Sequence, residues 1–131
     1  MLRDRWRALG IVMGFGAVYD LAFGLAILLF PATAGRVLRL PLPADPIYLF
    51  LDGILLVVLA AVYALPARHP ERFHPIAPIA AGGRLLGFVL FVAAWRDGRP
   101  TTFLLLGIAD LALGVVTAVA WLAASRARPS D

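Results

Sequence analysis

The sequence predicts an all-α integral membrane protein, an up-down-up-down four-helix bundle that forms one membrane domain over residues 1–131. The first observation is composition: 62% of the 131 residues are hydrophobic and 15% are charged. Soluble proteins average roughly 45–50% apolar residues and about 25% charged residues. The second is that apolar residues gather in four stretches, 8–30, 47–66, 76–95 and 102–124, each near the ~20 residues that cross a bilayer. A water-soluble globule and a disordered chain are therefore excluded.

The first stretch resembles a secretory signal, because Arg3, Arg5 and Arg7 precede its apolar run. The run is nevertheless longer than the 7–15 residues typical of a signal core, and three more stretches follow it. Asp20 in its middle costs roughly 2.5–3.5 kcal/mol on insertion, while the Leu, Ile, Val and Phe residues of the run contribute about −5 kcal/mol. We therefore expect an uncleaved first transmembrane helix.

The connections carry the residues that stop helices. Residues 35–40 mix apolar and basic side chains, which predicts a short interfacial helix. The proline-rich segment 41–46 cannot continue it, because proline lacks an N–H and restricts the residue before it, so we expect an extended segment leading to the second stretch. Prolines also precede the third stretch, and the sequence Asp97-Gly98-Arg99-Pro100 predicts a tight turn that makes the last two helices an antiparallel hairpin.

The arginines predict the orientation. All 12 basic residues are arginine, and eleven lie in or beside the connections and tails, where they meet lipid headgroups. One side of a four-span chain would carry seven of them, Arg3, Arg5, Arg7, Arg68, Arg72, Arg126 and Arg128, and the other side four, Arg36, Arg39, Arg96 and Arg99. The positive-inside rule then places both termini in the cytoplasm. Nucleic-acid binding is not predicted, because it needs a basic face on a soluble fold.

Aromatic residues near the ends of the stretches support these boundaries, because bulky rings with a polar edge prefer the membrane interface. On the inner side we expect Trp6, Tyr63, Phe73 and Trp121, and on the outer side Phe30, Tyr48, Trp95 and Phe103.

Each apolar stretch contains one ionisable residue: Asp20, Asp52, Arg84 and Asp110. At about 1.5 Å of rise per residue, these four can share one layer near the midplane. Charged groups at that depth point into the bundle and pair with one another. Three carboxylates and one guanidinium sum to −2, so we expect one or two protonated aspartates, or a cation, water or ligand that completes the site. Tyr48 and Asp52 are the expected outer wall of such a pocket.

The leading hypothesis is a non-enzymatic membrane protein whose Asp/Arg cluster binds or conducts a small ligand or protons. In the alternative, Arg84 is a structural clamp in an accessory subunit of a larger membrane complex or a homo-oligomer, which the small-residue pairs Gly10/Gly14 and Gly83/Gly87 favour. The expected partners are the lipid bilayer and a membrane protein or second copy; the small ligand is not identified.

A membrane enzyme stays an open third alternative, since paired acids could transfer protons. No nucleophile or metal-binding set accompanies the acids, so the sequence predicts no catalytic residue, cofactor or metal. The spacing of His69 and His74 does not fit a zinc site.

Residues 81–87, Ala-Gly-Gly-Arg-Leu-Leu-Gly, followed by Gly98-Arg99-Pro100 and Asp110, resemble the second hairpin of small uncharacterised bacterial four-helix membrane proteins, loosely of the DoxX-like type. The residue-level resemblance spans about residues 82–114. It implies a four-helix fold and a location in the bacterial inner membrane, and it assigns no catalytic residue.

Overall fold

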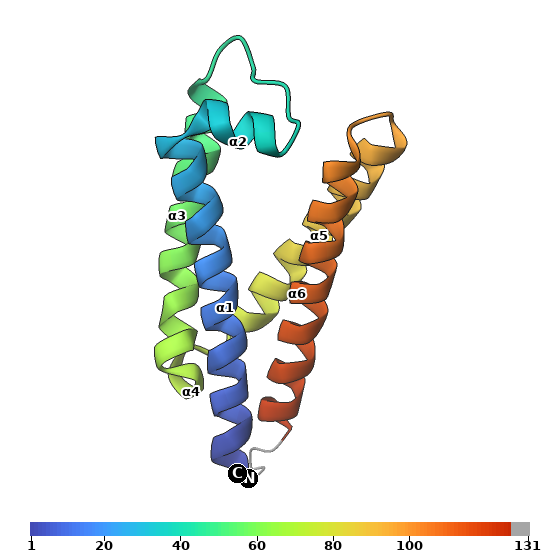
Figure 1. The fold of residues 1–131 in the computed structure, drawn as a ribbon. Coiled ribbons are helices and arrows are strands. Elements are labelled where there is room, and N and C mark those ends of the chain that lie inside the picture. Colours follow the sequence, from blue (N-terminus) through green and yellow to red (C-terminus); the bar gives the residue numbers. More distant parts are fainter. Residues whose placement is uncertain (127–131) are drawn as a thin grey trace.

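The structure is a computed structural model that describes residues 1–126, and over that range it is built from helices and contains no strand (Figure 1). Four helices are long: α1 (Leu2–Leu29), α3 (Ile47–Arg68), α5 (Ile76–Arg96) and α6 (Thr101–Ser125). Two are short: α2 (Pro31–Val37) and α4 (Pro70–Phe73). Helices α3, α5 and α6 match the predicted stretches to within two residues, whereas α1 begins six residues before the stretch 8–30. Each long helix is long and apolar enough to cross a membrane by length and composition.

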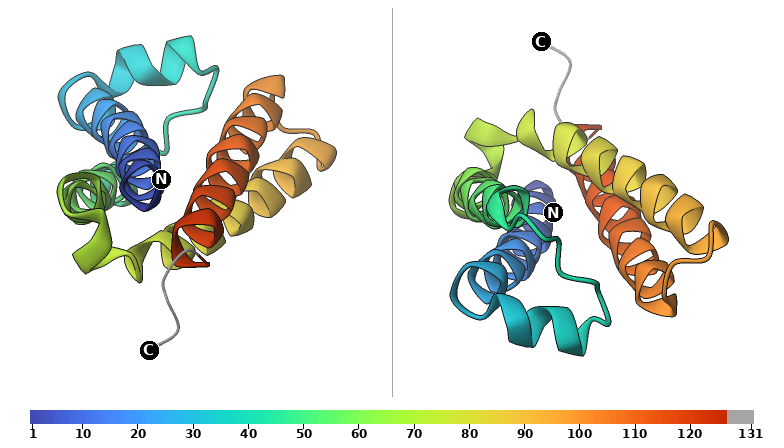
Figure 2. Two further views of the ribbon diagram at one scale, coloured as in Figure 1. Left: turned by 90° about the horizontal axis from the view of Figure 1, so that it is seen from below. Right: turned by 90° about the horizontal axis from the view of Figure 1, so that it is seen from above.

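The long helices form two hairpins, α1 with α3 and α5 with α6 (Figure 1). The hairpins meet near the N-terminus and diverge toward the end that carries α2, as the views along the molecule also show (Figure 2). Contacts between them run mainly from α1 to α6, with fewer from α3 to α5. The packing therefore differs from a uniformly tight bundle, because only one end of the second hairpin lies against the first.

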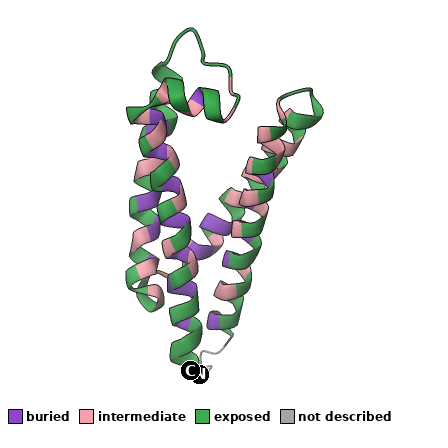
Figure 3. Cartoon of the chain, viewed as in Figure 1, coloured by how far each residue is buried: buried purple, intermediate pink, exposed green. Residues whose placement is uncertain are grey.

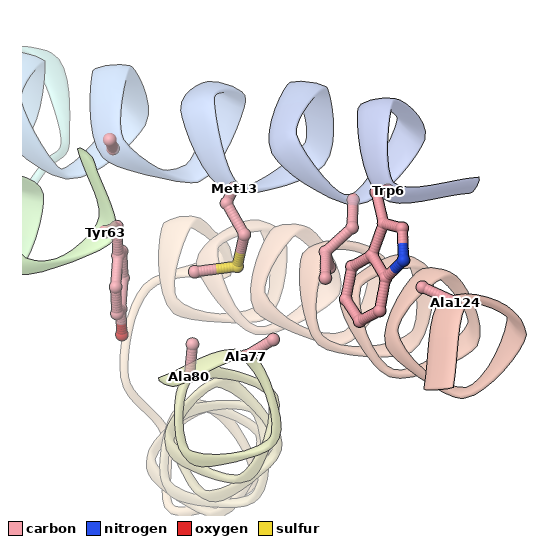
Figure 4. Packing of buried hydrophobic residues seen from close by; sticks show 8 residues of the cluster. Trp6, Met13, Tyr63, Ala77, Ala80 and Ala124 are labelled. Carbon is pink, nitrogen blue, oxygen red and sulfur yellow. The ribbon is translucent and has the colours of Figure 1, made fainter. Parts of the chain in front are cut away.

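A core fills the end where the hairpins meet. Trp6, Leu9 and Met13 of α1 are at most 3% exposed and pack toward Ala77 and Ala80 of α5 (Figure 4). Alanines on α5 allow this approach because they leave little side-chain bulk between the helices. Trp6, expected at the membrane interface, has its ring packed in this core.

The outer faces of the long helices are exposed and apolar (Figure 3). Phe15, Ile79 and Leu86 are 68%, 75% and 72% exposed, and many other large apolar side chains share this position. Soluble monomers rarely expose apolar patches larger than a few hundred Å². This surface is compatible with lipid contact.

Two glycines set the distance between α1 and α3. A Cβ atom added to Gly24 would lie 2.9 Å from the carbonyl oxygen of Gly53, and one added to Gly53 would lie 2.9 Å from Cγ of Leu28. Of the predicted small-residue pairs, Gly10 packs closely, with its added Cβ 3.0 Å from the carbonyl oxygen of Ala67, whereas Gly83 has open space. Gly83 therefore makes no close helix contact within the described chain.

The connection between α1 and α3 contains a short helix, but this helix lies earlier in the chain than expected. Helix α2 begins at Pro31, whose missing N–H is harmless in a first turn, and ends at Val37. Arg39 has a left-handed φ of 52°, and the Leu40 amide donates to the Gly35 carbonyl oxygen over 2.9 Å. This arrangement is the Schellman motif, which terminates helices, so the helix predicted at 35–40 is wrong in position. The absence of helix over 41–45 is confirmed.

Candidate functional site

Arg84 on α5 joins the two hairpins. Its Nη2 donates to Oδ1 of Asp20 on α1 over 2.7 Å, and its Nη1 donates to Oδ1 of Asp110 on α6 over 3.0 Å. Nη2 also lies 3.4 Å from the carbonyl oxygen of Gly16. The side chains of Asp20, Arg84 and Asp110 are only 3%, 11% and 12% exposed. These three residues, the Asp–Arg–Asp triad, therefore connect three helices through charge-assisted hydrogen bonds, which are stronger than neutral ones.

Glycines make room for the triad. A Cβ atom on Gly87 would collide with Oδ2 of Asp110, and one on Gly114 would lie 3.1 Å from Cβ of Arg84. The stretch around Arg84 is thus rich in small residues partly because α5 and α6 must approach closely enough for the carboxylate to reach the guanidinium.

Replacing Gly87 by alanine is expected to displace the Asp110 carboxylate, weaken its bond to Arg84 and lower stability by about 1 kcal/mol. The thermal midpoint of the purified protein in detergent checks this. Gly83→Ala is the matched control: it lies on the same helix with nothing within 4 Å of the added Cβ, so the better helix propensity of alanine leaves stability unchanged or slightly higher. Equal midpoints for the two variants would contradict the crowding at Gly87.

Two tyrosines that were not expected at the site lie beside Arg84. The guanidinium carbon lies 5.1 Å from the ring centroid of Tyr19 and 5.9 Å from that of Tyr63, within the range of cation–π attraction. Tyr63 is 8% exposed, and its ring packs in the core near the triad. Tyr63 lies near the end of an apolar stretch, and this place in the sequence suggested the membrane interface. The one sequence signal for an aromatic neighbour was the single arginine, Arg84, inside an apolar stretch.

A cavity of about 210 Å³ adjoins the triad between the hairpins. We call it the inter-hairpin cavity. Its lining combines the triad and Asp52 with apolar and aromatic side chains, namely Tyr19, Phe23, Ile27, Leu38, Leu40, Leu56, Phe91 and Leu106. A second space of about 200 Å³, the α2 hollow, lies beside it and shares Ile27, Leu38, Leu40 and Asp52. Asp52 therefore lies at the junction of both spaces.

The structure brings Asp20, Arg84 and Asp110 into direct contact and leaves the other two predicted residues apart. Asp52 lines the cavity, is itself an exposed residue, and makes no hydrogen bond or ion pair with any residue in the range 1–126. Tyr48 is 76% exposed and does not line either space. Only the aspartate of the expected outer wall thus faces the cavity.

The chemistry of the site is that of an acidic cavity with apolar walls. Three carboxylates face one guanidinium, so the lining carries a formal charge of −2 when all four groups are ionised. Within residues 1–126, no group of three or more His, Cys, Asp or Glu side chains is placed to hold a metal ion. Such a lining favours protons or a ligand with a positive charge.

The fold and the site define a helical protein with four candidate membrane spans and a buried Asp–Arg–Asp triad between two hairpins. Comparison with known proteins adds no relative, since no protein-family model, no curated protein and no solved structure matches the chain.

Proposed function

We propose that the protein is a multi-pass protein of the bacterial inner membrane, and that its inter-hairpin cavity binds a small ligand or protons. The up-down-up-down bundle would supply the walls, and Asp20, Asp52, Arg84 and Asp110 the charged groups. The observation that carries this proposal is the excess of carboxylates over cations along one cavity.

Asp52 separates this proposal from a purely structural clamp. One guanidinium can satisfy two carboxylates through its fork of donors, and Asp20 and Asp110 occupy both Nη atoms of Arg84. A clamp therefore has no use for a third acid. Ionisable groups at membrane depth are costly unless they pair or face a water-filled cavity, and Asp52 faces the cavity without a protein partner.

The arginine distribution supports cytoplasmic termini. Helix α4 lies at the same end as the N-terminus, while α2 and the turn between α5 and α6 lie at the other (Figure 1). Arginines are more frequent at the first of these ends, as the positive-inside rule expects of the cytoplasmic side. Arg128, one of the seven arginines expected on the cytoplasmic side, lies outside the described residues.

Because the chain has no cysteine, single cysteines can test whether the cavity is open to water. Leu106 lines the cavity, whereas its neighbour Leu105 is 60% exposed on the outer face of α6. In liposomes we expect a water-soluble thiol reagent to label the Leu106→Cys variant on the order of tenfold faster than Leu105→Cys, because only a hydrated thiol forms the reactive thiolate. Mass spectrometry of the intact protein follows the reaction.

Equal and slow labelling of both variants would show that water does not reach the cavity, and the proposed function would fail. Faster labelling at Leu105→Cys would place the outer face of α6, rather than the cavity, in water, and would contradict the membrane arrangement as well.

A further inference from the structure

We propose that the ligand of the inter-hairpin cavity is a small organic cation, an ammonium group attached to one apolar ring, with Asp52 as the residue that selects it. This inference rests on the proposed function and adds the chemical class of ligand.

The charges of the lining disfavour an anion. Both Nη atoms of Arg84 already donate to Asp20 and Asp110, so two carboxylates offset the positive charge that a bound anion would need. The same anion would face the unpaired carboxylate of Asp52. A monovalent cation instead reduces the formal charge of the lining from −2 to −1.

Unused acceptor atoms also point to a cation. The carboxylate of Asp20 is 3% exposed, and only its Oδ1 accepts a hydrogen bond from the described chain. Its Oδ2 therefore has no protein donor, and the same is true of Oδ2 of Asp110. An ammonium group carries several donors and no acceptor, so it can donate to these carboxylate oxygens.

The walls select an organic ion over a metal ion. Phe23, Phe91 and Leu106 contribute apolar surface, which a strongly hydrated metal ion cannot use, and hard cations require about six oxygen ligands. Aromatic faces in contrast attract organic ammonium groups. The volume of the inter-hairpin cavity also fits a ligand with one ring. An apolar cavity of about 150 Å³ accommodates benzene, and the inter-hairpin cavity measures about 210 Å³.

Asp52 is the selective residue because it belongs to both spaces. A ligand that passes from the α2 hollow to the triad meets Asp52 on the way. Arg99 also lines the α2 hollow, but its guanidinium lies over the ring of Phe103, 6.0 Å from the centroid, and forms no ion pair with Asp52. The negative charge of Asp52 thus remains available to a ligand.

The test measures protection of the Leu106→Cys variant against a neutral, water-soluble thiol reagent in liposomes. Three probes of similar size are compared: benzylammonium, benzyl alcohol and benzoate. We expect saturating benzylammonium to slow labelling by about tenfold, with no effect of the other two. In the same background, Asp52→Asn is expected to raise the concentration of benzylammonium needed for half-protection by about tenfold, equivalent to about 1.4 kcal/mol.

Asp97→Asn is the matched control, because it removes an acid from the turn after α5 without touching the cavity lining. It corrects for attraction of the cation to the protein surface and leaves protection unchanged. Protection by benzyl alcohol equal to that by benzylammonium, protection by benzoate, no protection by any probe, or protection insensitive to Asp52→Asn would each overturn the cation proposal. All four outcomes still require labelling of the unprotected Leu106→Cys variant, whose absence would instead remove the proposed function.

Discussion

Replacing Arg84 by alanine is expected to destabilise the protein by about 3–5 kcal/mol, the usual cost of removing one partner from a buried ion pair. The change leaves the carboxylates of Asp20 and Asp110 facing one another without the guanidinium that now donates to both. It also removes a side chain that joins the two hairpins. Titration of the purified protein in mixed micelles with sodium dodecyl sulfate, followed by circular dichroism, measures the loss.

Arg96→Ala provides the control for Arg84→Ala, because Arg96 lies in the exposed last turn of the same helix. Its removal is expected to change stability by less than about 0.5 kcal/mol. Neutralising both acids in the Arg84→Ala background, with Asp20→Asn and Asp110→Asn, should restore part of the loss, since contacting residues are not additive. A loss below about 1 kcal/mol for Arg84→Ala would show that the triad does not hold the hairpins together.

The second large effect is expected for Gly24→Ala. Its added Cβ would lie 2.9 Å from the carbonyl oxygen of Gly53 and 2.9 Å from Cγ2 of Val57. The carbonyl oxygen belongs to the α3 backbone and cannot rotate away, so α1 and α3 must move apart. Overpacking of this kind costs typically about 1–3 kcal/mol, and the same detergent titration measures it.

Gly82→Ala is the corresponding control, because nothing lies within 4 Å of its added Cβ. The two substitutions add the same methyl group to long apolar helices, so any difference between them reports the close approach of α1 and α3. If Gly24→Ala were as stable as Gly82→Ala, the tight packing of the first hairpin would be refuted.

The four long helices could be predicted from the sequence because their length and depth depend on hydropathy alone. Helices α3, α5 and α6 begin at Ile47, Ile76 and Thr101, within a residue of the predicted stretches. The meeting of Asp20, Arg84 and Asp110 was likewise predictable, since a single guanidinium in an apolar bundle has few other partners.

The arrangement around each helix could not be predicted in the same way. The long helices are apolar on nearly every side, so no periodicity marks the face that packs against a neighbour. No such pattern therefore indicated that Tyr63 packs near Arg84, and Gly83 looked like a packing residue although it has open space. Such assignments depend on which helices meet, and hydropathy does not determine that.

Tyr48 and Asp52 illustrate the same difficulty within one helix. Residues four apart share a helical face, which is why both were expected to line one pocket. The hairpins diverge toward the α2 end (Figure 1). Asp52, although exposed, still lines the cavity, whereas Tyr48, one turn closer to that end, is 76% exposed and lines neither space.

The central claim is that Arg84 binds two aspartates and leaves the third free beside the cavity. Magic-angle-spinning NMR on protein in lipid bilayers can test it directly, by measuring distances from ¹⁵N-labelled guanidinium nitrogens to ¹³C-labelled aspartate carboxyl carbons. Direct hydrogen bonds predict short distances of about 3–4 Å from Arg84 to the carboxyl carbons of Asp20 and Asp110, and no such coupling to Asp52. A short distance to Asp52, or the absence of coupling to Asp20 or Asp110, would contradict the account.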